Sequence, residues 1–134
     1  MQKGSINRVI LVGHLGSDPE TRYTTTGNAV ATFNLATNET WKNSEGNLED
    51  KTEWHRCVLF GKLAESAKDV LTKGQLIYLE GRLRTRQWED KDNVRRYTTE
   101  IVGEMFTMLG GRKQSSETAT GDAQNGGNGD DLPF

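Results

Sequence analysis

The chain has 134 residues, 33% of them hydrophobic, and a formal net charge of −2. This length is enough for one modest domain, and a mean hydropathy of −0.74 indicates that part of the chain does not fold. No apolar run reaches the roughly 18 residues of a transmembrane helix, and no signal-peptide pattern opens the sequence, so we expect a cytoplasmic protein without a membrane partner.

Two strands and a connection are predicted at the N-terminal end. β-Branched residues over 6–13 predict a buried strand. The turn-forming run Gly16-Ser17-Asp18-Pro19 predicts a connection across 15–23. A second strand is expected over 29–37, with its apolar side chains on one face of the pleat.

A polar segment over 38–51 follows and contains Gly46-Asn47, which predicts a hairpin loop. Trp41 lies near the start of this loop, where a place in the core is not natural for it. The third strand, over 52–60, has Trp54, Arg56 and Phe60 on one face. One interpretation is a buried strand with a single arginine extending to solvent, because aromatic strands usually face a core.

A second strand of the same kind favours another interpretation. A helix is predicted over 63–71, closed by Lys73-Gly74, and a strand follows over 76–88. Trp88 and three arginines share one face of that strand, namely Arg82, Arg84 and Arg86. Burying an unpaired charge costs several kcal/mol, roughly, so this face is wet or touches an anion. Such a face is typical of a platform that stacks bases and neutralises phosphates. The alternative is a solvated face with a tryptophan there by chance.

A charged turn over 89–94 precedes the last strand, which is expected over 97–109 and ends at Gly110-Gly111. The order is therefore three strands, one helix and two strands. This order predicts an all-β fold with one helix, the five-stranded oligonucleotide-binding (OB) barrel. Because fold does not fix function, the aromatic and basic residues must carry the functional argument.

Catalytic and metal sites are not indicated by the sequence. Cys57 is the single cysteine, which excludes an internal disulfide and fits a reducing cytosol. His14 and His55 are far apart, so no zinc-ligand cluster is apparent. There is no Gly-rich phosphate loop and no Ser/His/Asp set, and a lone cysteine on an apolar strand face is more often packing than a nucleophile. We therefore expect no enzyme, no cofactor and no metal.

The C-terminal segment differs in composition and charge. All 17 basic residues lie in 1–113 with 15 acidic residues, whereas 114–134 has four acids and no base. Small and polar residues dominate 114–129, which predicts a disordered linker. The last five residues combine two acids with bulky apolar groups, as Asp130, Asp131, Leu132, Pro133 and Phe134. They predict a partner-docking peptide, the alternative being an acidic solubilising tail.

Several motifs in this order resemble the bacterial single-stranded DNA-binding protein family. They are Asn7-Arg8-Val9-Ile10-Leu11-Val12-Gly13, Thr52-Glu53-Trp54-His55-Arg56, Phe60-Gly61-Lys62-Leu63-Ala64-Glu65, Tyr78-Leu79-Glu80-Gly81 and the terminal Asp130-Asp131-Leu132-Pro133-Phe134. The resemblance covers residues 5–111 densely, and then the last five. It implies a homotetramer with single-stranded DNA wrapped around it and His55 at a subunit interface. It also implies base stacking at Trp41, Trp54, Phe60 and Trp88.

The expected function is sequence-tolerant single-stranded DNA binding that protects unwound DNA, since every base has a π-face that an aromatic ring can stack on. Phosphates are expected to contact Arg22, Arg56, Lys62, Lys73, Arg84 and Arg86. Residues 1–113 would bind DNA and oligomerise, and the terminal peptide would recruit replication, recombination and repair enzymes at the nucleoid. An RNA-binding or replication-restart module on the same barrel is the rival interpretation, because such modules also stack bases.

Overall fold

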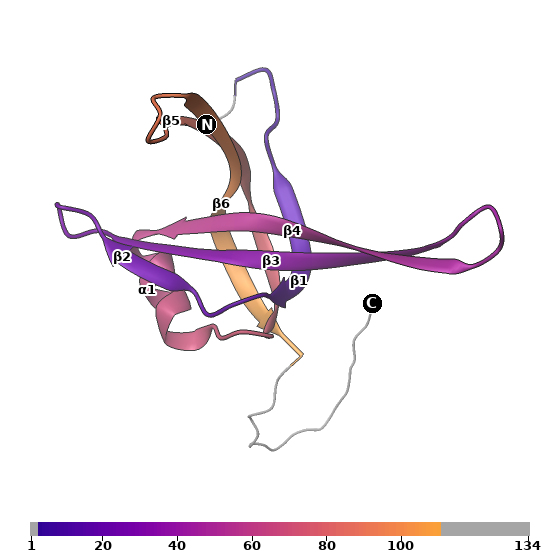
Figure 1. Cartoon of the computed structure of the whole chain (residues 1–134). Helices are drawn as coiled ribbons and strands as arrows, with labels where there is room; N and C mark the ends of the chain where they lie inside the picture. The colour runs from indigo at the N-terminus through magenta and orange to yellow at the C-terminus, as the bar shows by residue number, and fades with distance from the viewer. Residues whose placement is uncertain (1–2, 111–134) are drawn as a thin grey trace, which may run out of the picture.

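The computed structural model describes residues 3–110, which form a β-barrel with one helix (Figure 1). The elements in chain order are β1 Val9–Leu15, β2 Glu20–Tyr23, β3 Ala29–Lys42, β4 Leu48–Phe60, α1 Gly61–Val70, β5 Leu76–Glu89 and β6 Arg95–Leu109. Strands β1, β5, β6, β4 and β3 are hydrogen-bonded in that order, and a pairing of β1 with β3 closes the ring. The expected five-stranded OB barrel with one helix is therefore confirmed.

The barrel interior is filled by one face of each strand. Phe33 and Leu35 of β3 alternate inward, as do Ile77 and Leu79 of β5, and all four are almost fully buried. Helix α1 packs on β3 and β4 through its small buried residues. No helix within residues 3–110 is long and apolar enough to cross a membrane.

The seam that closes the barrel depends on a glycine in β1. A Cβ on Gly13 would lie 2.2 Å from the carbonyl oxygen of Ala36 in β3. Only a residue without a side chain lets the two backbones come this close. The pairing of His14 with Ala36 and of Leu15 with Leu35 begins at this point.

The β3–β4 hairpin is much longer than expected. The polar segment 38–51, predicted as a loop, continues both strands and forms an arm that projects from the barrel (Figure 1). Cross-strand bonds stabilise the arm: Thr40 Oγ1 donates to Asp50 Oδ1 at 2.8 Å, and Thr52 Oγ1 donates to Asn38 Oδ1 at 2.7 Å. Polarity misled the prediction, because a two-stranded arm in solvent needs no apolar face.

Three smaller expectations are also wrong. The connection over 15–23 contains β2, which pairs with β3 outside the ring. Strand β1 is not buried throughout, since Ile10 and Val12 are exposed. Helix α1 ends at Val70 with an extended Leu71, so Lys73-Gly74 forms the following turn and does not cap the helix.

The C-terminal predictions cannot be placed on this fold. The linker over 114–129, the docking peptide over 130–134 and the end of the domain expected over 1–113 lie outside the described residues. Their roles stay predictions.

Candidate nucleic-acid interface

The two aromatic strand faces lie on one surface although β4 and β5 are not neighbours. Strand β6 lies between them and pairs antiparallel with β5, so that Glu100 stands opposite Arg84. Strand β6 also runs parallel to β4, with Cys57 opposite Ile101, which brings Arg56 beside Glu100. Because paired residues share a face, β4, β6 and β5 present these side chains together. We call this surface the β4–β6–β5 face.

The aromatic side chains of the β4–β6–β5 face are open to solvent. Trp54 is 58% exposed, and Phe60 and Trp88 are each 42% exposed. The interpretation of 52–60 as a strand with buried aromatics is therefore wrong for both aromatic residues. The indole N–H of Trp88 donates to Thr98 Oγ1 of β6 at 2.8 Å, which holds its ring on the face. All three rings can take a stacked base without unfolding.

Trp54 rests on the backbone of the β1–β2 connection. A Cβ built on Gly16 would lie 2.4 Å from Cζ3 and 3.0 Å from Cη2 of the indole. Gly16 therefore leaves the space that the Trp54 ring occupies. The ring is supported from below and open above, as a stacking platform requires.

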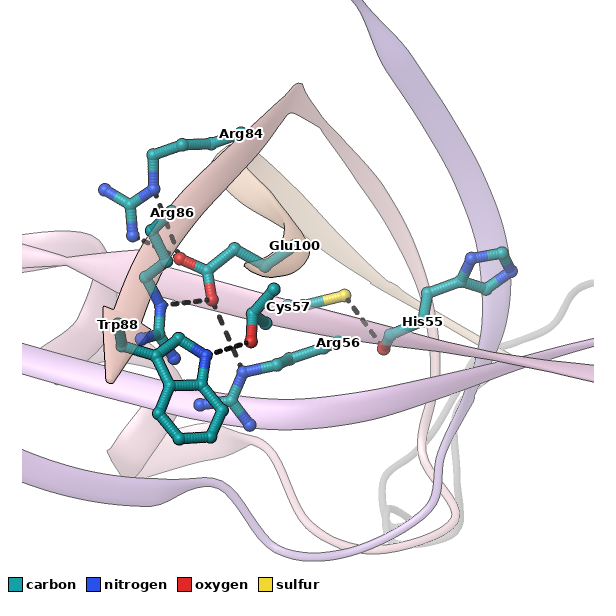
Figure 2. A network of polar contacts seen from close by, with 8 residues as sticks. His55, Arg56, Cys57, Arg84, Arg86, Trp88 and Glu100 are labelled. Atoms are coloured by element: carbon teal, nitrogen blue, oxygen red, sulfur yellow. Dashed lines mark hydrogen bonds and ion pairs between the residues drawn. The ribbon is translucent and has the colours of Figure 1, made fainter. Parts of the chain in front are cut away.

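One buried carboxylate connects three arginines of the face, Arg56, Arg84 and Arg86 (Figure 2). Arg56 Nε and Arg86 Nε donate to Glu100 Oε1, at 3.4 and 3.3 Å. Arg84 Nε donates to Glu100 Oε2 at 3.2 Å, and its Nη2 makes a further, shorter bond to the same oxygen. The Glu100 side chain is 1% exposed, whereas the three arginine side chains are 36 to 42% exposed. Sequence alone predicted the arginines but not this shared counter-ion.

The Glu100 carboxylate stays ionised at neutral pH. Burial alone would raise its pKa, but the hydrogen bonds and charges of Arg84 and Arg86 outweigh burial and lower the pKa below its usual value. One negative charge meets three positive charges here, so this cluster keeps a net positive charge. This net charge can attract a phosphate backbone.

A second contact and a hollow complete the centre of the face. The Arg84 guanidinium lies 5.4 Å from the centroid of the Phe60 ring, within cation–π range. An open hollow of about 540 Å³ is lined by Arg56, Arg86, Trp88 and Thr98. It places a stacking ring and two guanidinium groups around one space. A nucleotide has both a base and a phosphate, and this space offers a partner for each.

The other predicted cations, Arg22, Lys62 and Lys73, lie outside the Glu100 cluster. Arg22 of β2 stands opposite Val30 of β3, which stands opposite Phe60, so Arg22 extends the same face. Lys62 is exposed on α1, two residues after Phe60. Lys73 is exposed in the α1–β5 connection, where its backbone N–H donates to Asp18 Oδ1 at 2.7 Å. Lys62 and Lys73 do not join the Glu100 cluster.

Trp41 is not brought together with the other three aromatics. It lies on the β3–β4 arm opposite Glu49, five residue pairs beyond the pair of Ala36 with Trp54. Strand alternation places it on the other face of the arm from Trp54. It is 42% exposed. A base could reach Trp41 only by following the arm away from the barrel.

His55 and Cys57 lie on the opposite side of β4 from Arg56 (Figure 2). His55 is half-buried and shares a 2.9 Å hydrogen bond between its Nε2 and Thr37 Oγ1. Cys57 is fully buried, and its burial raises the pKa of the thiol to about 12. Within residues 3–110 no cluster of His, Cys, Asp or Glu could hold a metal ion.

Three residues that position the face were missed from sequence: Gly16, Thr98 and Glu100. Glu100 could have been predicted, because it precedes Ile101 and Val102 in a strand. An acid buried there needs cationic partners. Gly16 and Thr98 could not have been predicted, because turn glycines and strand threonines are common. Their roles depend on which side chain lies across from them.

Comparison with known proteins gives a consistent result. The model of the single-strand binding protein family matches residues 6–109. The SSB of Plasmodium falciparum in complex with ssDNA is 33% identical with a TM-score of 0.73, over 82% of this chain and 100% of that one. A deletion mutant of the single-stranded DNA binding protein from Thermus aquaticus is 37% identical with a TM-score of 0.71, over 80% of this chain and 52% of that one. The chain thus spans about half the length of the Thermus protein. Since the family model covers the whole barrel, the chain belongs to the single-strand binding protein family.

Proposed function

We propose that this protein binds single-stranded DNA with little sequence preference and so protects unwound DNA. The observation that carries the proposal is the β4–β6–β5 face, where Trp54, Phe60 and Trp88 are exposed beside Arg56, Arg84 and Arg86. Rings stack on any base, and guanidinium groups neutralise phosphates without reading sequence. The family, whose members bind DNA and are not enzymes, supports the same function.

The test is to truncate one stacking ring at a time and titrate the variants with an oligodeoxythymidine. Trp54→Ala and Trp88→Ala should each weaken binding by about 1–3 kcal/mol while the fold survives. Tyr97→Ala is the matched control, because Tyr97 is a strongly exposed ring on the other face of β6. If Tyr97→Ala weakens binding as much as the tryptophan variants do, the proposed face is wrong. An oligouridine of equal length tests the RNA alternative.

The stacking path is proposed to continue from the face to Trp41 on the arm, and the phosphate path to include Arg22, Lys62 and Lys73. Arg22 supports this path best, because the strand register places it in line with Phe60. Substituting each cation with Gln and measuring the salt dependence of binding would show which ones contact phosphates.

We infer further that the protein forms a homotetramer with His55 at an interface. Residues 9–13 of β1 pair with β5 on one side and have no strand partner on the other within the described residues. Ile10 and Val12 are exposed on this strand. An unpaired edge with exposed apolar side chains favours pairing with a second copy.

Residues 130–134 are proposed to bind replication, recombination and repair enzymes, in the cytoplasm and at the nucleoid. Support comes from the sequence, where two acids precede Leu132, Pro133 and Phe134. A basic-rimmed apolar pocket would recognise this chemistry. Deleting residues 130–134 should leave single-stranded DNA affinity equal or slightly higher and abolish enzyme recruitment in a pull-down. Undiminished recruitment would show that the enzymes bind elsewhere.

A further inference from the structure

Glu100 bonds only some of the N–H donors of Arg56, Arg84 and Arg86. A guanidinium has five N–H donors, one on Nε and four on the two Nη atoms. Arg56 and Arg86 each give only the Nε–H to Glu100. Arg84 gives its Nε–H and one bond from Nη2. Within residues 3–110, the Nη groups of Arg56 and Arg86 donate no hydrogen bond to protein. Most of the donors therefore remain available.

The bonded and the remaining N–H donors differ in exposure. The carboxylate that receives the Nε–H bonds is 1% exposed and lies under the arginines, whose side chains are more than one-third exposed. Figure 2 shows the terminal nitrogens of Arg56 and Arg86 on the side away from Glu100. The inner edges of these two arginines are thus bonded to protein, and their outer edges face solvent.

We propose that Glu100 is a positioning residue for single-stranded DNA: it holds Arg56, Arg84 and Arg86 by their inner edges, so that their outer N–H groups present one fixed phosphate-binding surface. Glu100 keeps these bonds when DNA is bound and does not itself contact DNA. The inference rests on the proposed single-stranded DNA binding. Its physical basis is preorganisation, because arginines already fixed lose less side-chain entropy on contacting phosphate.

The same carboxylate also supports a stacking ring. Arg84, held by two bonds to Glu100, lies over the Phe60 ring at 5.4 Å. Releasing Arg84 would free this guanidinium to move off the ring. Loss of Glu100 should therefore affect both phosphate binding and the Phe60 platform.

A different role for Glu100, that of offsetting positive charge, predicts the opposite effect on DNA affinity. If Glu100 only offsets positive charge, its removal makes the face more positive and DNA binds more tightly. Glu104 gives the matched control, since it lies on the same strand and pairs with one arginine, Arg82, at 3.6 Å, with both side chains about half exposed. Glu100→Gln and Glu104→Gln change the net charge equally, but only the first releases the three arginines.

The first experiment titrates an oligodeoxythymidine into the full-length protein and both variants over a range of salt concentrations. We expect Glu100→Gln to bind about tenfold more weakly than Glu104→Gln. Its log–log salt slope should be shallower by about 0.7 for each phosphate that the released arginines no longer neutralise. Equal or tighter binding by Glu100→Gln, with an equal or steeper slope, would overturn the inference. If the unaltered protein does not bind the oligonucleotide, the proposed function fails instead.

The second experiment does not require the variant to fold. Arginine Nε–H signals in ¹H–¹⁵N spectra of the unaltered protein report carboxylate bonding through slow exchange and a downfield shift. Within residues 3–110 we expect four such signals, three from Arg56, Arg84 and Arg86 on Glu100 and a fourth from Arg96, whose Nε donates to Asp90 at 2.9 Å. The three signals of the Glu100 cluster should persist when oligodeoxythymidine saturates the protein. If these signals move to the positions of free arginine on DNA addition, phosphate displaces Glu100 and the positioning role is wrong.

Discussion

Gly16 and Trp54 show how a single residue without a side chain can set the position of a binding group. The indole comes within 2.4 Å of the position that a Cβ on Gly16 would take, while Trp54 is 58% exposed. Trp54 can therefore move into solvent without opening the core. A change at Gly16 should alter binding more than it alters stability.

Gly16→Ala should displace the Trp54 ring and weaken oligodeoxythymidine binding by up to about 1–3 kcal/mol, the contribution of one stacked base. The thermal midpoint should change little, and tryptophan fluorescence quenching should fall together with the affinity. Ser17→Ala, at the next and exposed position, is the control. Unchanged affinity in Gly16→Ala would show that Trp54 does not stack in its present position.

Cys57 leads to a pH-dependent prediction. Burial raises the pKa of its thiol from 9.0 to about 12, so between these values the unfolded chain releases a proton that the folded chain retains. The free energy of unfolding should therefore fall as the pH rises above 9, by at most about 1.4 kcal/mol per pH unit from this group, with no contribution below pH 9.

Cys57→Ala isolates this effect from the lysines and tyrosines that titrate in the same range. Urea unfolding at pH 8 and pH 10 should show a smaller loss of stability for the variant than for the unaltered protein. Two identical pH dependences would mean that the thiol is ionised in the folded protein. The absolute stability of the variant should be lower at both values because a cavity replaces the sulfur.

At the scale of elements, closure of the barrel depends on the point where β1 stops pairing with β5 and begins pairing with β3. This contact is short, since only His14 and Leu15 pair with β3. The backbone approach at Gly13 and Ala36 makes the contact possible. One added methyl group at Gly13 would therefore oppose closure of the whole barrel.

Gly13→Ala should destabilise the protein by about 1–3 kcal/mol or more, because the opposing atom is a backbone oxygen that no rotamer change can move. Urea unfolding checks the value. His14→Ala, at the next position with an exposed side chain, should have little effect. If Gly13→Ala is as stable as His14→Ala, the strands can separate at the seam without cost.

For the whole molecule, the net charge of −2 conceals a basic domain and an acidic terminal segment. Residues 1–113 have 17 basic and 15 acidic side chains, and 114–134 have four acids and no base. The cations that matter are concentrated on one face. Local charge therefore decides binding more than the isoelectric point does.

Binding of single-stranded DNA should weaken steeply with salt, with a log–log slope of about −0.7 per phosphate neutralised. Arg86→Gln should make this slope shallower by about that amount. Lys51→Gln should leave it unchanged, because Lys51 pairs with Glu53 on the side of β4 opposite to Arg56. A flat salt profile in the unaltered protein would leave stacking as the only source of affinity.

Assembly is tested at the same scale. His55→Lys should weaken the proposed tetramer, because a lysine charge at an interface must lose its hydration. Sedimentation of the variant and the unaltered protein at micromolar concentration measures the change. Circular dichroism separates dissociation from unfolding. Unfolding is the expected result if His55 only stabilises the monomer through its hydrogen bond to Thr37.

Much of the fold followed from local patterns. Alternation predicted that the apolar side chains of 29–37 share one face and that Trp54, Arg56 and Phe60 share one face, and the structure has Phe33 and Leu35 inside the barrel and the second group outside. Period-two patterns are set by backbone geometry and need no knowledge of neighbours. The arm over 38–51 was missed because polar residues give no such pattern when both faces are wet.

The sequence by itself determined the barrel, the single helix and the set of aromatic and basic residues on β4 and β5. Only the tertiary structure decided that β6 lies between those strands, that Glu100 joins three arginines and that Gly16 underlies Trp54. The physical reason is distance along the chain: Arg56 and Glu100 are 44 residues apart. Side-chain periodicity shows the face on which a residue lies, whereas its partner across the sheet depends on strand order and register.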